Sequence, residues 1–187
     1  MDLIKLGRTQ YADDDTTPLK RLVKLRFPSL AIGLFLGIFL SFATSRFEDL
    51  LSHDIKIAFF IPFIVYMAAA VGAQTENIYS RDLKSGKASF RNYLLKESLL
   101  GVILGVLSSS ISWVVVMVWI KSSQIAFAVS LAMLASIAIA PIVALLVTEF
   151  LSLEHSDPAV GSGPIATVIQ DTLSILIYGI IASAIIL

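Results

Sequence analysis

A single carboxylate, Asp171, stands inside the last long apolar segment of the chain. An ionised side chain in hydrocarbon costs on the order of 2.5–3.5 kcal/mol on insertion scales, so it usually has a function. Thr167, Ser174 and Tyr178 lie four, three and seven residues from it, a spacing that puts all four on one helix face. Carboxylate and hydroxyl oxygens suit a hard cation such as Mg²⁺. The stripe therefore predicts a path for a hard cation, with Asp171 as its one carboxylate.

The alternative for Asp171 is a structural role, in which it pairs with a buried Arg or Lys. The other long apolar segments have no basic residue at comparable depth. Pro164 precedes Asp171 by seven residues and is tolerated in the first turn of a helix but not in its interior. We therefore predict that the last helix begins at Pro164, with Asp171 about 10 Å into the span at about 1.5 Å per residue.

A second polar stretch lies in an earlier apolar segment, around a run of small residues. Small residues let helices approach closely or leave room for a hydrated ion, and simple helix packing explains them about as well. Helical spacing puts several of these positions on one face, which we predict to be the opposite wall of the path. The residues predicted to line it from the two segments are Ala70, Ala73, Gln74, Asn77, Thr167 and Ser174.

Three charged residues lie near the expected inner membrane surface. Glu76 and Arg81 are at the end of the earlier segment, and Glu97 opens the next one. Glu76 and Arg81 belong either to the path or to the headgroup region. Glu97 is either an interfacial carboxylate or the partner of Arg81.

Long apolar blocks separated by short charged segments make up most of the chain. Of its 187 residues, 57% are hydrophobic and 15% charged, whereas soluble domains have roughly a quarter charged. A bilayer core takes about 20 helical residues to cross. The sequence therefore predicts an all-α integral membrane protein, embedded in a lipid bilayer, with five transmembrane helices near residues 27–44, 57–80, 97–120, 124–148 and 164–187.

Residues 1–26 are predicted to form a cytoplasmic tail, and residues 27–187 the five-helix cation-transport domain. Basic residues at near-helical spacing close the tail, which predicts a short amphipathic helix on lipid headgroups, with Lys20, Arg21, Lys24 and Arg26. Lys and Arg are concentrated in this tail and between the second and third spans. By the positive-inside rule, we expect a multi-pass protein of the cell membrane with a cytoplasmic N-terminus and an external C-terminus.

Helix packing can be predicted for the third and fourth spans. Only Lys121, Ser122 and Ser123 separate them, so they should form a tight antiparallel hairpin. Gly101 and Gly105 in the third span suit close helix approach.

Several function classes are disfavoured. The formal net charge is zero, whereas a nucleic-acid partner would favour a strongly basic surface. The chain has no cysteine, which excludes disulfides and thiolate metal sites. It has no phosphate-binding glycine loop, nucleophile elbow or His-Glu-x-x-His motif, so we predict that it is not an enzyme.

Two segments carry a family pattern. Residues 157–164 read Asp-Pro-Ala-Val-Gly-Ser-Gly-Pro, followed by Thr167 and then Asp171 four residues later. The second segment follows a looser pattern, in which a proline (Pro62) is followed by small residues and a glutamine (residues 69–74) and then by an arginine (Arg81). The next helix opens with a basic residue and a glutamate, Lys96 and Glu97. Together these segments resemble the membrane domain of the MgtE magnesium channels and their solute-carrier relatives, over about residues 20–187.

The resemblance implies a homodimer whose central pore is lined by the second and fifth helices of both subunits. It implies that Asp171 recognises hydrated Mg²⁺, the transported ion. It also implies that the residues before it, around Gly163 and Thr167, line the path.

The chain departs from the family pattern in two ways. The family Asn of the second helix is Ala70 here, which removes an amide oxygen from the expected pore lining. The full-length channels carry large cytoplasmic regulatory domains, whereas 26 residues precede the first predicted span here. We therefore expect any regulatory domain to come from a separate subunit.

The preferred function is a divalent cation channel, and Mg²⁺ is the ion that we expect it to conduct. One alternative is a secondary transporter that exchanges a divalent cation for protons or sodium, since an Asp flanked by Gly and Pro breaks suits both. The other is a non-transport membrane scaffold subunit, in which Asp171 would have no role in transport.

Overall fold

The described residues of the computed structural model are 15–86, 88–153 and 158–187, and they form helices without a strand. Five helices of this part are long and apolar enough to cross a membrane, which confirms the predicted all-α membrane protein with five spans. In chain order the elements are α1 (Leu19–Ser45), α2 (Glu48–His53), the 3₁₀ helix η1 (Ile55–Phe60), α3 (Ile61–Lys84), α4 (Phe90–Ile120), α5 (Ser123–Leu153) and α6 (Pro158–Ile186).

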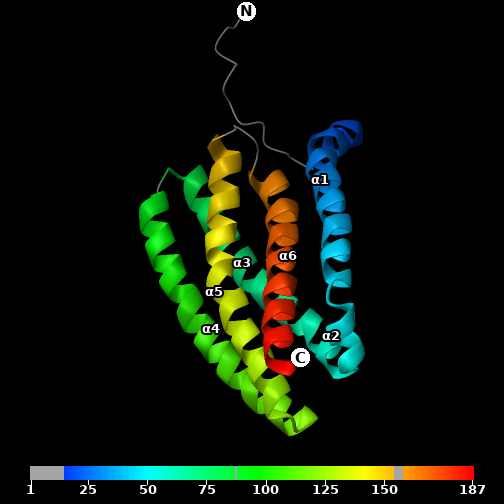
Figure 1. Ribbon diagram of the computed structural model, residues 1–187. Coiled ribbons are helices and arrows are strands. Elements are labelled where there is room, and N and C mark those ends of the chain that lie inside the picture. Colours follow the sequence, from blue (N-terminus) through cyan, green and yellow to red (C-terminus); the bar gives the residue numbers. More distant parts are fainter. Residues whose placement is uncertain (1–14, 87, 154–157) are drawn as a thin grey trace, which may run out of the picture.

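Helix α5 is the centre of the bundle. It packs against α3, α4 and α6, whereas α1 lies outside the others and packs against α6 (Figure 1). The start of α1 and the end of α6 lie at opposite ends of the bundle, as an odd number of spans requires (Figure 1). Because α3 also packs on α6, the two helices that carry the predicted path are neighbours within one protomer.

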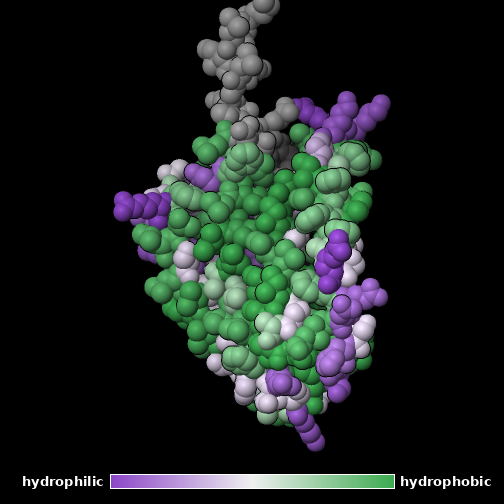
Figure 2. All heavy atoms as spheres, viewed as in Figure 1, coloured by the Kyte–Doolittle hydropathy of each residue, from purple (hydrophilic) through white to green (hydrophobic). Residues whose placement is uncertain are grey.

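The outer surface of the bundle suits lipid. Figure 2 shows a continuous hydrophobic face over the middle of the bundle, with hydrophilic residues toward its ends and near α2. Large apolar side chains on the outer helices are strongly exposed, among them Phe35 at 73% and Val118 at 73%. Exposed apolar surface on this scale is typical of membrane contact in a multi-span protein.

The predicted hairpin of α4 and α5 is confirmed. Lys121 ends α4 in the left-handed conformation, with a φ of 58°, and α5 begins two residues later. Both predicted packing glycines are buried against α5. A methyl group on Gly105 would lie 2.9 Å from the carbonyl oxygen of Leu134, and one on Gly101 would lie 3.0 Å from that of Ala138. Only glycine therefore permits this approach without a shift of one helix.

Several helix boundaries differ from those predicted: α1, α4 and α6 begin earlier, and α3 and α5 end later. Helix α1 begins at Leu19, so the predicted amphipathic segment is continuous with the first span. Residues 1–14 of the predicted tail lie outside the described residues. The predicted start of the last helix at Pro164 is wrong, because α6 begins at Pro158. A proline is favoured at the first helical position, and Pro164 then falls in the second turn, where it leaves one carbonyl without a helical donor.

Candidate functional site

Helix α6 carries Asp171 near the middle of its length. The side chain is half-buried, and its Oδ1 atom is buried without a hydrogen-bond partner in the described part of the chain. Among those residues, no Lys or Arg forms an ion pair with Asp171, which counts against the predicted structural alternative. A buried oxygen without a donor costs about 1–3 kcal/mol, so the fold holds this carboxylate at a cost.

The polar stripe predicted around Asp171 divides into two parts. Thr167 is exposed, whereas Ser174 and Tyr178 are buried inside the protomer. The Tyr178 hydroxyl donates to the Ile57 carbonyl at 2.9 Å and so fixes α6 to η1. Thr167 and Asp171 are therefore the members of the stripe that remain near the surface of the protomer.

The predicted wall on α3 faces away from the core of the protomer. Ala73, Gln74 and Asn77 are exposed, and Ala70 is half-buried. The opposite side of α3 is buried against the other helices. Exposed polar residues within a membrane helix are unfavourable against lipid, so this face is better matched by a polar partner than by hydrocarbon.

Gly163 marks the close approach of α6 to α3. A methyl group on Gly163 would lie 3.6 Å from Oε1 of Glu76. The N-terminal half of α6 and the C-terminal half of α3 therefore meet at the Glu76 carboxylate. From the sequence alone, Glu76 could belong either to the path or to the headgroup region.

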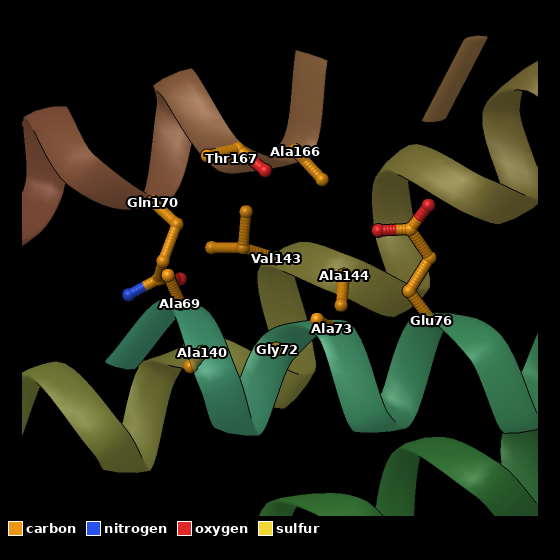
Figure 3. A pocket seen from close by; sticks show the side chains of 10 residues that line it. All are labelled: Ala69, Gly72, Ala73, Glu76, Ala140, Val143, Ala144, Ala166, Thr167 and Gln170. Atoms are coloured by element: carbon orange, nitrogen blue, oxygen red, sulfur yellow. The ribbon is translucent and has the colours of Figure 1, made fainter. Parts of the chain in front are cut away.

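A small cavity of about 20 Å³ lies between α3, α5 and α6 (Figure 3). Its apolar lining consists mainly of alanine and glycine, whose small side chains leave the space open. Three oxygen-bearing side chains also line it, those of Glu76, Thr167 and Gln170 (Figure 3). The full lining is Ala69, Gly72, Ala73, Glu76, Ala140, Val143, Ala144, Ala166, Thr167 and Gln170.

Gln170 was missed by the sequence analysis. It is 3% exposed, and its Nε2 donates to the Ser136 carbonyl at 3.2 Å and to the Ser174 hydroxyl at 3.3 Å. Its Oε1 is buried without a partner in the described part of the chain. The available signal was an uncharged amide inside an apolar span, immediately before Asp171.

Hydrogen bonds join α3 to its neighbours at the end of the bundle where α3 ends. Thr75 donates to Glu97 at 2.7 Å, which joins α3 to α4, and Tyr79 donates to Glu149 at 2.6 Å, which joins α3 to α5. Arg81 pairs with the adjacent Asp82 at 3.0 Å. The hypothesis that Glu97 is the partner of Arg81 is therefore wrong, because Glu97 binds Thr75.

No group of three or more His, Cys, Asp or Glu residues lies together in the ranges that the structure describes. Such groups are typical of resident transition metals. The oxygen atoms of Asp171, Glu76, Thr167 and Gln170 are instead suited to hard cations that pass or bind reversibly.

The comparisons with known proteins agree with this chemistry. The model of the MgtE family, described as a divalent cation transporter, matches residues 61–181. A protein of Enterococcus faecalis named magnesium transporter MgtE is 36% identical over 185 residues, which are 97% of this chain and 41% of the relative. A Bacillus subtilis protein of the same name is 29% identical over 162 residues, covering 85% of this chain and 36% of the relative. The chain thus spans about two fifths of the length of these relatives.

Proposed function

Since the chain belongs to the MgtE family, we propose that it carries a divalent cation, with Mg²⁺ in first place, across the cell membrane. The path runs between two copies of the chain and is lined by α3 and α6 of both. Asp171 supports this proposal most directly, because it is a carboxylate inside a membrane-spanning helix with a buried oxygen that no described residue satisfies.

A two-fold assembly explains why one carboxylate per chain is enough. Two copies of Asp171 near a symmetry axis supply two negative charges, which match one dication. Closed two-fold dimers are the commonest oligomers. The exposed polar face of α3, with Gln74 and Asn77, then meets the partner instead of lipid. Mg²⁺ gives up its waters reluctantly, so these oxygens would accept hydrogen bonds from the hydrated ion.

The orientation of the chain is a separate prediction. The N-terminus is expected in the cytoplasm and the C-terminus outside, because Lys and Arg are concentrated before α1 and between α3 and α4. Impermeant labelling of a tag at each end should therefore modify the C-terminal tag in intact cells and the N-terminal tag only after lysis. Labelling of both ends from the same side would refute the five-span topology.

Thr167→Val is expected to reduce divalent cation flux by a few-fold. The substitution removes a hydroxyl that orients waters of the ion but leaves every charge in place, and neutral hydrogen bonds contribute about 0.5–1.5 kcal/mol. Thr167 is exposed, so folding should be little affected. Flux would be compared in liposomes at equal protein content. Complete loss of flux with normal assembly would show that Thr167 does more than orient water.

Reconstitution of the chain in liposomes tests the proposed function. Uptake of Mg²⁺, Mn²⁺ and Co²⁺ would be followed with an enclosed indicator dye. Uptake that follows membrane potential without a proton or sodium gradient would favour the channel over the secondary transporter. Absence of uptake for every divalent cation, in a preparation shown to be folded, would instead favour the scaffold alternative.

A further inference from the structure

Tyr66 lies on the exposed face of α3. It is 70% exposed, so most of its side chain lies at the surface of the protomer. Ala73 and Asn77 are also exposed, and they follow Tyr66 by seven and eleven residues, a spacing that puts all three on one helix face. The polar face of α3 therefore continues toward the start of the helix and includes a phenol hydroxyl.

Two contacts fix the position of α6 along α3. Near the start of α6, a methyl group on Gly163 would lie 3.6 Å from Oε1 of Glu76. Near its end, the Tyr178 hydroxyl donates to the Ile57 carbonyl at 2.9 Å. The two helices therefore run antiparallel, and Asp171 lies about halfway between the two contacts.

Tyr66 lies at the level of Asp171. It is about halfway between the same two contacts on the side of α3. The Gln170 side chain, immediately before Asp171, extends toward Ala69 (Figure 3). Ala69 is within one helical turn of Tyr66, which gives the same level.

The two residues also lie on the same side of the protomer. Thr167 of α6 and Ala73 of α3 are both exposed and line one cavity, so the exposed faces of the two helices adjoin. Asp171 follows Thr167 by one turn on the face of α6, and Tyr66 precedes Ala73 by two turns on that of α3. A carboxylate and a phenol hydroxyl therefore lie on adjoining faces at the same depth.

The alternative for Tyr66 is a place among the aromatic residues of the membrane interface, where Trp and Tyr are enriched. Trp119 marks that level at the end of α4, because it is 62% exposed and stacks on Phe59 with ring centroids 6.3 Å apart. Tyr66 follows Phe59 by seven residues, about 10 Å further along the helix at about 1.5 Å per residue. Against lipid at that depth, the hydroxyl would lose water without gaining a partner, which is unfavourable.

We propose that Tyr66 is a second ligand of the transported cation, and that its hydroxyl accepts hydrogen bonds from the waters of the ion at the depth of Asp171. Mg²⁺ keeps several of its waters, so a ligand of the hydrated ion needs an acceptor oxygen and not a charge. A phenol hydroxyl is such an acceptor. The inference rests on the proposed function, because it assigns a further residue to the same path.

Thiol accessibility tests where Tyr66 lies and does not depend on flux. Tyr66→Cys in the cysteine-free chain should react in liposomes with a positively charged methanethiosulfonate, because this reagent attacks ionised thiols, which form in water and not in hydrocarbon. Ile38→Cys is the control, since Ile38 is 63% exposed on α1 and lies at a similar distance from the same end of the bundle. Tyr66→Cys should react at least about tenfold faster, because its thiol meets water. Mg²⁺ should slow this reaction by occupying the path.

Tyr66→Phe tests the hydroxyl itself. It should raise the half-saturating Mg²⁺ concentration for flux by about three- to tenfold, the effect of losing one neutral hydrogen bond. Maximal flux should change little, because the ring still fills the same space. Tyr93→Phe is the matched control, since it removes a hydroxyl that donates to Asp82 within the protomer at 2.5 Å. It should leave the half-saturating concentration unchanged.

The outcomes separate this inference from the proposed function. Equal reactivity of Tyr66→Cys and Ile38→Cys would show that Tyr66 faces lipid and would overturn the inference. A half-saturating concentration in Tyr66→Phe equal to that of the parent chain would also overturn it, and loss of flux in Asp171→Asn would then leave the proposed path intact. Absence of divalent cation flux in the folded parent chain would overturn the proposed function, and this inference with it.

Discussion

Asp171→Asn is expected to lose most divalent cation flux while the protein still folds and assembles. Asparagine keeps the size and one acceptor oxygen but removes the charge that attracts the cation. Even at about 8 Å, one unit charge acting on another contributes about 2 kcal/mol at an effective dielectric of about 20, which corresponds to a loss of more than about tenfold. Flux should be measured in liposomes with an enclosed Mg²⁺ indicator.

Folding should survive this substitution because Oδ1 of Asp171 makes no hydrogen bond or ion pair in the described part of the structure. Asp49→Asn is the matched control, since it makes the same change at an exposed position on α2. It should conduct like the parent chain. If Asp171→Asn also conducts Mg²⁺ like the parent at equal protein content, the path does not follow this face of α6.

Asn77→Cys is expected to cross-link into a covalent dimer in the membrane. The chain has no cysteine of its own, so a single introduced thiol reports one position. Asn77 is exposed on α3 in the isolated protomer, on the face proposed to meet the partner. A short bis-maleimide applied to membranes should convert most of the protein to dimer, as seen by gel electrophoresis.

Leu99→Cys provides the control for this experiment. Leu99 is 63% exposed on the outer face of α4 and lies, like Asn77, toward the expected inner side of the membrane. It should face lipid and stay monomeric under the same reagent. Equal cross-linking of both variants would indicate random collisions, and a dimer with Leu99→Cys alone would assign the interface to α4 instead of α3.

The spans were predictable because membrane helices are determined by length and hydrophobicity, which a single sequence states directly. Helix ends were less predictable. Lys20 to Arg26 are polar enough to suggest a separate segment, yet they continue the first helix. Pro158 and Pro164 both provide a helix start signal, and the first of them begins α6.

The site was only partly predictable because spacing along one helix does not say what that helix packs against. Thr167 and Ser174 share a face by periodicity, yet the first is exposed and the second is buried against the interior of the protomer. Gln170 is held in place by a hydrogen bond to Ser136 on α5, which lies 34 residues earlier in the sequence. A local sequence pattern cannot predict a contact between residues so far apart. The cavity likewise exists only where small residues of three helices meet.

Thiol accessibility at Thr167 is the most direct test of the claim that the cation passes along α6. Thr167→Cys in the cysteine-free chain should still conduct, because Thr167 contributes no charge. A positively charged methanethiosulfonate reagent should then block Mg²⁺ flux in liposomes, and Mg²⁺ should slow the modification by occupying the path. Complete modification, verified by mass, with unchanged flux would contradict the account and exclude this face of α6 from the cation path.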